Sequence, residues 1–159
     1  MIVSIHAAND ADRPWMLEII RGWGADFVVT RGRKVFAAEL PAFVAVDGDG
    51  EKIGLLTYEI IGDQCEVVTL DAFKQFSGIG TALMNRVIET ARAAGCRRVW
   101  LITTNDNLDA IRFYQKRGFT IAAVHVNAIA HSRTLKPSIP LIGNYGIPIR
   151  DEVELEKWV

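Results

Sequence analysis

The feature that most constrains this chain is a glycine-bearing turn set between a strand pattern and a helix pattern. Residues 75–81 read Gln-Phe-Ser-Gly-Ile-Gly-Thr. Residues 65–70 precede this turn and are rich in β-branched side chains, which is typical of a strand. Apolar side chains then recur at helical spacing from Ile79 to Ala91, and Gly95 supplies a stop signal. The sequence therefore predicts a strand, a tight turn and a helix in succession.

The turn has the properties of an anion-binding site. Gly78 and Gly80 lack a Cβ, so a ligand can approach the backbone closely at both positions. The first turn of a helix carries amide N–H groups without partners and the positive end of the helix dipole. These features together favour a phosphate group. The alternative is that the glycines only connect the strand to the helix.

The same turn resembles motif A of the GNAT superfamily, the acyl-CoA-dependent N-acyltransferases. The family pattern is Gln or Arg, two residues, Gly, one residue, and Gly or Ala. Gln75, Gly78 and Gly80 fill these positions. A Walker loop is excluded because no Gly-Lys-Ser/Thr follows, and the dinucleotide fingerprint is excluded because it needs three glycines in G-x-G-x-x-G spacing.

A second segment, residues 107–119, resembles motif B of the same superfamily. The family pattern is Asn, two residues, Ala, two residues, an aromatic, Tyr, three residues, and Gly-Phe. The matching residues are Asn107, Ala110, Phe113, Tyr114, Gly118 and Phe119. The resemblance covers residues 42–124 in motifs and element order. It extends loosely to the first strand and helix, and to the last thirty residues only as a final hairpin.

Length and composition agree with one soluble globular domain over residues 1–159. The chain is 50% hydrophobic and 23% charged. Its net charge of −1 gives no reason to expect a nucleic acid or membrane partner, and no apolar run approaches the ~20 residues needed to span a bilayer. Cys65 and Cys96 fit reduced thiols, no Cys/His cluster has metal-ligand spacing, and residues 1–12 lack a signal-peptide pattern. We expect a cytoplasmic protein without a metal.

The remaining patterns predict the order of the elements. We expect strands at residues 2–7, 42–46, 52–61, 65–72, 97–104, 119–126 and 151–158, and helices from Asp10 or Asp12 to Gly22, at 79–91 and at 108–116. Residues 27–40 have no clear pattern, but the cluster at 30–34 indicates a loop or short turn. Pro137 and Pro140 favour an irregular path over 128–141. The acidic last strand is expected at an exposed sheet edge, with attraction of a cationic acceptor or a dimer contact as alternatives.

The resemblance implies an α/β fold of the α+β type, in which a mixed sheet is split between two parallel strands, here residues 65–72 and 97–104. Acetyl-CoA is the implied co-substrate, and its pantetheine arm enters the gap. By this likeness Leu70 and Asp71 adjoin the arm, the Leu70 N–H is an oxyanion donor, and Asn107 contacts the cofactor. The pyrophosphate is expected on the turn formed by Gln75, Phe76, Ser77, Gly78, Ile79, Gly80 and Thr81.

Tyr114 is the expected general acid. A phenol ordinarily has a pKa of about 10 and can donate a proton to the departing thiolate. The alternative is that Tyr114 only packs on the sheet beside Phe113.

The general base is less constrained than the acid. Glu66 is the first candidate because residues 66–70 resemble the strand that carries a glutamate base in the histone-type branch of the superfamily. Its even spacing from Leu70 also predicts that both side chains share one strand face. Asp71 is the second candidate, and a water chain to bulk solvent is a third possibility. His6, His125 and His131 lack a motif context, and we expect none of them to be catalytic.

The resemblance predicts an N-acetyltransferase in which an amine attacks acetyl-CoA directly, through a tetrahedral intermediate, without a covalent enzyme intermediate. The acceptor is expected to be a small-molecule or peptide amine, and a homodimer is possible. Trp15 and Trp23 are candidates for the acceptor wall. The alternatives are a catalytically silent acyl-CoA-binding sensor and an interaction protein that kept only the scaffold.

Overall fold

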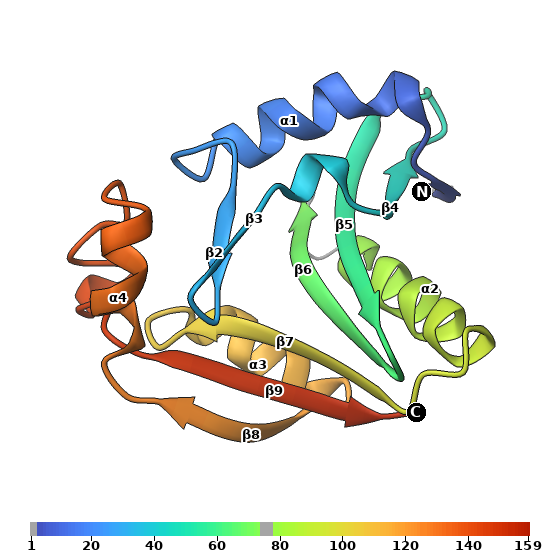
Figure 1. The fold of residues 1–159 in the computed structure, drawn as a ribbon. Helices are drawn as coiled ribbons and strands as arrows, with labels where there is room; N and C mark the ends of the chain where they lie inside the picture. The colour runs from blue at the N-terminus through green and yellow to red at the C-terminus, as the bar shows by residue number, and fades with distance from the viewer. Residues whose placement is uncertain (1–2, 74–77) are drawn as a thin grey trace.

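The computed structural model describes residues 3–73 and 78–159. Its main feature is a mixed sheet with strand order β1-β4-β5-β6-β7-β9-β8 (Figure 1). These strands are β1 (Ser4–Ala7), β4 (Ala42–Val46), β5 (Lys52–Ile61), β6 (Gln64–Ala72), β7 (Arg98–Thr104), β8 (Thr120–His125) and β9 (Glu152–Trp158). The helices are α1 (Arg13–Arg21), α2 (Ile79–Ala93), α3 (Leu108–Lys116) and α4 (Ala128–Leu135). A separate hairpin joins β2 (Val28–Thr30) to β3 (Arg33–Val35).

The sheet is split between its two parallel strands, as the family resemblance implies. β6 and β7 are in parallel register at Gln64 with Arg98, Cys65 with Val99, and Glu66 with Trp100. Beyond Glu66 the two strands diverge, whereas every other neighbouring pair in the sheet is antiparallel (Figure 1). The divergence leaves one side of β6 without a strand partner over its last residues, which is where a ligand can enter.

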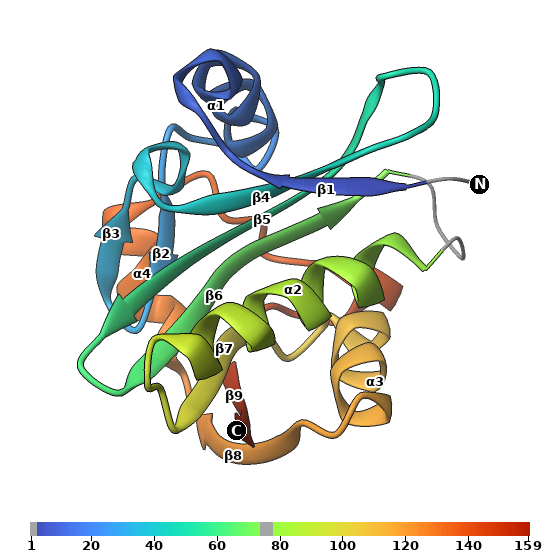
Figure 2. The ribbon, with the colours of Figure 1, turned by 90° about the vertical axis from the view of Figure 1, so that its right-hand side faces the viewer.

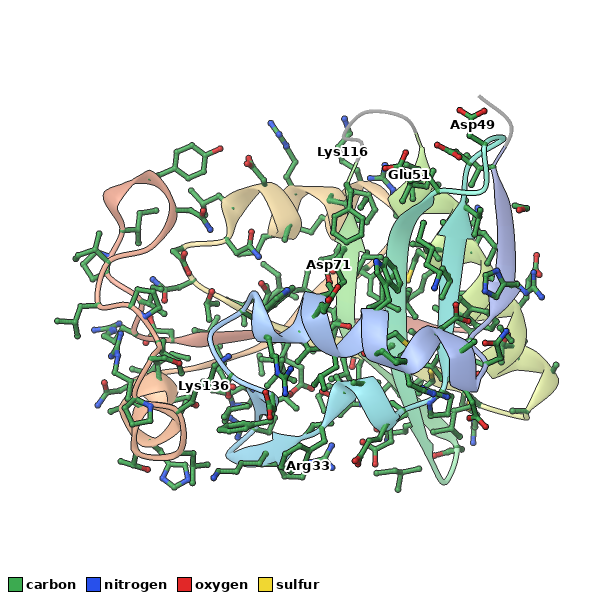
Figure 3. The ribbon with its side chains drawn as sticks, turned by 90° about the horizontal axis from the view of Figure 1, so that it is seen from above. Arg33, Asp49, Glu51, Asp71, Lys116 and Lys136 are labelled. Carbon is green, nitrogen blue, oxygen red and sulfur yellow. The ribbon has the colours of Figure 1, made fainter. Side chains whose placement is uncertain are left out.

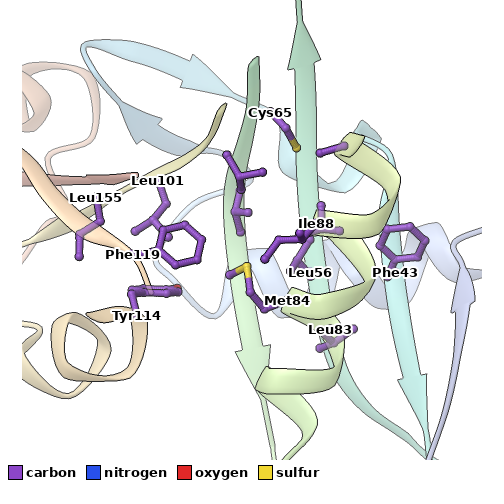
Figure 4. Packing of buried hydrophobic residues seen from close by; sticks show 14 of the residues in the cluster. Phe43, Leu56, Cys65, Leu83, Met84, Ile88, Leu101, Tyr114, Phe119 and Leu155 are labelled. Atoms are coloured by element: carbon purple, nitrogen blue, oxygen red, sulfur yellow. The ribbon is translucent and has the colours of Figure 1, made fainter. Parts of the chain in front are cut away.

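Helices cover both faces of the sheet. α1 lies over one face, and α2 and α3 lie over the other (Figure 2). Burial of apolar side chains on the α2 side forms the larger core, in which Tyr114 and Phe119 from the α3 region lie beside Leu101 and Leu155 from the sheet (Figure 4). A second core beneath α1 includes Met16. Apolar burial of this kind is the main stabilising term in folding.

Two segments differ from their sequence-based expectations, and a third is more ordered than its pattern indicates. The stretch from Phe27 to Leu40 contains β2, β3 and a 3₁₀ turn, and the short turn expected within residues 30–34 joins the two strands. The stretch after Val126 begins with α4, and the expected irregular path starts only near Pro137. The expectation that the last strand is an edge is wrong, because β8 pairs along its outer side and Glu152 is buried.

A β-bulge changes the direction of side chains along β6. Thr69 pairs with Thr57 and Val67 pairs with Tyr58, so Val68 has no partner of its own on β5. Val67 therefore packs in the α2-side core, and so does Leu70, although the two residues are three positions apart and would lie on opposite faces of a regular strand. The expectation that Glu66 and Leu70 share one face is wrong for this reason.

Within the described part of the chain, no helix is both long enough and apolar enough to cross a membrane. Cys65 and Cys96 are both buried and unpaired, in agreement with the expectation of reduced thiols.

Candidate active site

The split between β6 and β7 opens into two adjoining cavities. The first cavity, about 290 Å³, is bounded by β2, β6, β7 and the α4 region. The second cavity, about 480 Å³, lies between the beginning of α2 and one side of α3. Leu70, Ala110 and Tyr114 line both cavities. Two molecules bound in the two cavities would meet at this junction, so a reaction between them could take place there.

The beginning of α2 forms one end of the second cavity. Gly78, Ile79, Gly80 and Thr81 all line it, and they include the first amide groups of the helix. Gly78 has a φ of +78°, a backbone conformation that glycine adopts without strain, and a Cβ there would meet nothing within 4 Å. The predicted site residues Gln75, Phe76 and Ser77 lie outside the described residues.

Gly80 has a different role from the one its motif position suggests. A Cβ on Gly80 would lie 3.1 Å from Cζ of Phe113, and Gly80 is buried. Its missing side chain therefore allows α2 and α3 to pack closely, whether or not a ligand approaches. Substitution of Gly80 would disturb this packing, so binding experiments need another position.

Basic side chains surround the same cavity. Arg112, Lys116 and Arg117 line it, with Asp109 as the acidic residue among the lining positions that the structure describes. The Arg117 guanidinium lies 3.6 Å from the centre of the Phe113 ring and donates through Nε to Thr81 Oγ1 at 2.8 Å. These contacts fix Arg117 across both helices. The cavity thus combines helix-start amides with three cations, which suits a ligand that carries several phosphates.

Tyr114 lies where the two cavities meet. Its ring packs edge-on against Phe113, with centroids 5.3 Å apart, and against Phe119 at 5.8 Å. Burial, together with the nearby charge of Asp71, raises the pKa of the Tyr114 hydroxyl above its usual value. The hydroxyl is therefore protonated at neutral pH. It has no hydrogen-bond partner among residues 3–73 and 78–159.

Asp71 stands beside this junction with an unusual environment. Its Oδ1 accepts a hydrogen bond from Nε1 of Trp23 at 3.2 Å. Its Oδ2 is buried and has no partner in the described structure. Burial raises the pKa of Asp71 to about 6, and the Trp23 bond opposes this shift by stabilising the charged form. A carboxylate with such a pKa can accept a proton near neutral pH.

Glu66 lies on the other side of the bulge and is held by two partners. Thr30 Oγ1 donates to Oε2 at 2.7 Å, and Arg33 Nη2 donates to Oε1 at 3.3 Å. Burial raises the pKa of Glu66, while Thr30 and Arg33 oppose the rise. Neither Glu66 nor Asp71 is among the residues that line the two cavities. Asp71 is nevertheless close enough to Tyr114 for its charge to raise the pKa of the Tyr114 hydroxyl, whereas Glu66 has no such effect.

The other predicted residues are divided between the cavities and the core. Asn107 lines the first cavity and donates through Nδ2 to Thr103 Oγ1 at 3.1 Å, but it does not line the second cavity. Trp23 also lines the first cavity. Trp15 does not, and it packs against Phe73 with ring centroids 6.2 Å apart.

The histidines lie outside both cavities. His6 pairs with Asp12 at 3.1 Å and His125 with Glu154 at 3.0 Å. His131 is on α4 and lines neither cavity. Among the described residues, no group of three metal-ligating side chains is close enough to hold a metal ion.

Sequence reasoning missed the contribution of the α4 region to the first cavity. Ile129, Ser132 and Lys136 line it, together with Glu152 from β9. Pro137 and Pro140 led to the expectation of an irregular path where α4 lies. The interior position of β9 in the sheet is known only once β8 is seen to pair with it. Residues 128–138 mix apolar, polar and basic side chains, so no signal in the sequence indicates that Lys136 is buried.

Comparison with known proteins shows which family shares these motifs and this fold. The model of the acetyltransferase (GNAT) family matches residues 10–119, which is more than half of the chain. The chain belongs to the acetyltransferase (GNAT) family. This membership confirms the resemblance found in the two motifs and supports acyl transfer as the general activity.

Individual members of the family agree with this assignment. An uncharacterized protein of Bacillus subtilis, YdhI, is 47% identical over 137 residues, which cover 86% of each chain. The IAA acetyltransferase from Bacillus cereus has a TM-score of 0.74 at 22% identity and covers 99% of this chain and 100% of its own. A GNAT family acetyltransferase from Elizabethkingia anophelis, solved with acetyl-CoA bound, has a TM-score of 0.73 at 20% identity, over 99% of this chain and 98% of its own. The two structures establish the shared fold.

Proposed function

We propose that this protein is an N-acetyltransferase that moves an acetyl group from acetyl-CoA to an amine by direct attack. The observation that carries the proposal is the junction of the two cavities at Leu70, Ala110 and Tyr114. One cavity has the charge of a phosphate-binding site, and the other is a smaller, mostly apolar chamber. The family relative from Elizabethkingia anophelis, solved with acetyl-CoA bound, supports this donor.

The residues present fit acetyl-CoA. The amides at the start of α2 and the side chains of Arg112, Lys116 and Arg117 would hold its phosphates. The free side of β6 beyond Glu66 would pair with the amide groups of the pantetheine arm, as an added strand does. Bound in this way, acetyl-CoA supplies the thioester that the amine attacks.

The proposed roles at the junction follow from position and protonation state. The Leu70 N–H would donate to the oxyanion that develops when the new C–N bond forms. Tyr114 is protonated and would give its proton to the sulfur as the C–S bond breaks. The Asp71 carboxylate would accept the proton that the amine loses. Glu66 would instead hold the β2–β3 hairpin against the sheet through Thr30 and Arg33.

The test of this function is an acceptor screen. Thiol release from acetyl-CoA would be followed across panels of small amines, amino acids and peptides, with the acetylated product identified by mass. We expect amine-dependent release that Tyr114→Phe reduces strongly. Calorimetric binding of acetyl-CoA without release for any amine would instead indicate a silent sensor, and absence of binding would indicate a scaffold alone.

A further inference from the structure

A buried lysine forms part of the wall of the first cavity. Lys136 is only 6% exposed and lines the cavity with Ser132 and Ile129 from the same segment. Its ammonium group has no ion pair and no side-chain hydrogen bond in the described part of the chain. A buried charge without a partner is costly, so natural proteins rarely keep one unless a ligand compensates it.

The position of Lys136 is fixed by its neighbours. Its backbone N–H donates to the Ser132 carbonyl at 2.8 Å, which places it at the end of α4. Its Cε lies 3.7 Å from the position that a Cβ on Gly24 would occupy. The side chain therefore runs from α4 towards the turn after α1, where Trp23 also lines the cavity.

The other charged group of the cavity is already neutralised. Glu152 accepts a hydrogen bond from Arg31 Nη1 at 2.9 Å and another from the Arg31 backbone N–H at 3.3 Å. Among the described lining residues, Lys136 is thus the charged one that lacks a partner. Burial lowers the pKa of Lys136, because the ammonium is desolvated and no nearby anion stabilises its charge.

Acidic and basic groups occupy different parts of the site. Figure 3 shows Asp71 on β6 and Lys136 towards α4, apart from each other. Lys136 lines the first cavity, whereas Asp71 does not. Most of the lining residues are apolar, among them Val28, Val67, Ile129, Ile139 and Ile149. This arrangement complements a molecule with an amine at one end, an anion at the other and an apolar side group.

We propose that Lys136 binds the carboxylate of the acceptor, and that the acceptor is a small apolar amino acid. The inference rests on the proposed function and specifies its substrate class. The amine would face Asp71 and Tyr114, while the carboxylate would face the Lys136 ammonium. A cavity of about 290 Å³ has room for a molecule of this size.

The test compares matched acceptors in wild-type protein and in Lys136→Met, which keeps the length of the side chain and removes its charge. Alanine, valine, leucine and phenylalanine would each be measured beside the amine that lacks the carboxylate, and beside the corresponding aminophosphonate. We expect wild-type protein to favour the amino acid in kcat/KM by about 10- to 100-fold, the range of a hydrogen bond to a charged group. Lys136→Met should lose this preference, because kcat/KM for the amino acid falls to the level of the plain amine.

Lys34→Met is the matched control, because Lys34 is exposed on β3 and lines neither cavity. It should keep the preference for the amino acid. Equal kcat/KM for both members of every pair in wild-type protein would overturn the inference and leave the transferase function intact. A preference for the aminophosphonate would overturn the choice of a carboxylate.

A binding measurement separates this inference from the proposed function. N-acetylleucine and its neutral amide would be titrated calorimetrically into wild-type protein and Lys136→Met, with no acetyl-CoA present. Preferential binding of N-acetylleucine that Lys136→Met abolishes supports the inference even if no transfer is observed. Equal binding of the acid and the amide, or no binding of either, overturns it.

Discussion

The indole Nε1 of Trp23 donates to one carboxylate oxygen of Asp71 at 3.2 Å, while the other oxygen is buried and unpartnered in the described structure. The two residues come from distant parts of the chain, the turn after α1 and the end of β6. The indole fixes the orientation of the carboxylate without neutralising it. In the proposed function, this unpartnered oxygen would accept the proton that the amine loses.

The pH profile of Asp71→Asn tests this arrangement. The pKa of Asp71 is raised to about 6, so the carboxylate is the charged base above that pH and the neutral acid below it. We expect kcat/KM of wild-type protein to fall as pH decreases through about 6. Asp71→Asn should lower kcat/KM and abolish this acid limb, as measured by steady-state thiol release across pH.

Glu66→Gln is the matched control for that profile, because it removes the basicity of the competing carboxylate. We expect it to retain the acid limb, since both carboxylate oxygens of Glu66 already accept hydrogen bonds from Thr30 and Arg33. Loss of the limb in Glu66→Gln, with retention in Asp71→Asn, would return the role of base to Glu66.

Trp23→Phe should move the acid limb. The Trp23 bond stabilises the charged form of Asp71, and its removal should raise the pKa of Asp71 further. The limb of kcat/KM is therefore expected at higher pH than in wild-type protein. Trp15→Phe serves as the control because Trp15 packs on Phe73 and does not line the first cavity. A limb that shifts equally in both variants would contradict a specific contact.

The part of the site on continuous motifs could be predicted from the sequence. The beginning of α2 and the segment containing Tyr114 follow from local patterns and their order. The split between β6 and β7 follows from the family resemblance that these motifs carry. The bulge at Val68 could not be predicted from the sequence. An extra residue in one strand is recognised only when its pairing with the neighbouring strand is known.

The α4 region escaped sequence reasoning for a different reason. The segment has no strong apolar stripe, and Pro137 and Pro140 mask the helix that ends at Leu135. Lys136 takes its meaning from segments far from it in sequence, including Trp23 and Val28 across the cavity. The lack of a counter-ion near the Lys136 ammonium becomes visible only once these segments are packed together.

Charge reversal at Lys116 tests the phosphate-binding role of the second cavity. Lys116 is exposed at its edge, and Lys116→Glu replaces an attractive charge by a repulsive one. An exposed pair of charges interacts by ~1 kcal/mol at close range in water, so we expect acetyl-CoA to bind about tenfold more weakly. Calorimetry at low and high salt should show that the loss shrinks as salt increases. Arg92→Glu, at the far end of α2, should bind acetyl-CoA as wild-type protein does.

Tyr114→Phe tests the proton donor at the junction of the cavities. The substitution keeps the ring and its contacts with Phe113 and Phe119, and it removes the hydroxyl that burial holds protonated. General acid catalysis contributes ~10²–10⁴ in rate, so kcat should fall within that range while the affinity for acetyl-CoA changes little. Tyr58→Phe is the matched control, because Tyr58 stacks on Phe43 and lines neither cavity. If kcat of Tyr114→Phe stays close to that of Tyr58→Phe when chemistry limits turnover, the proton reaches the sulfur from another source.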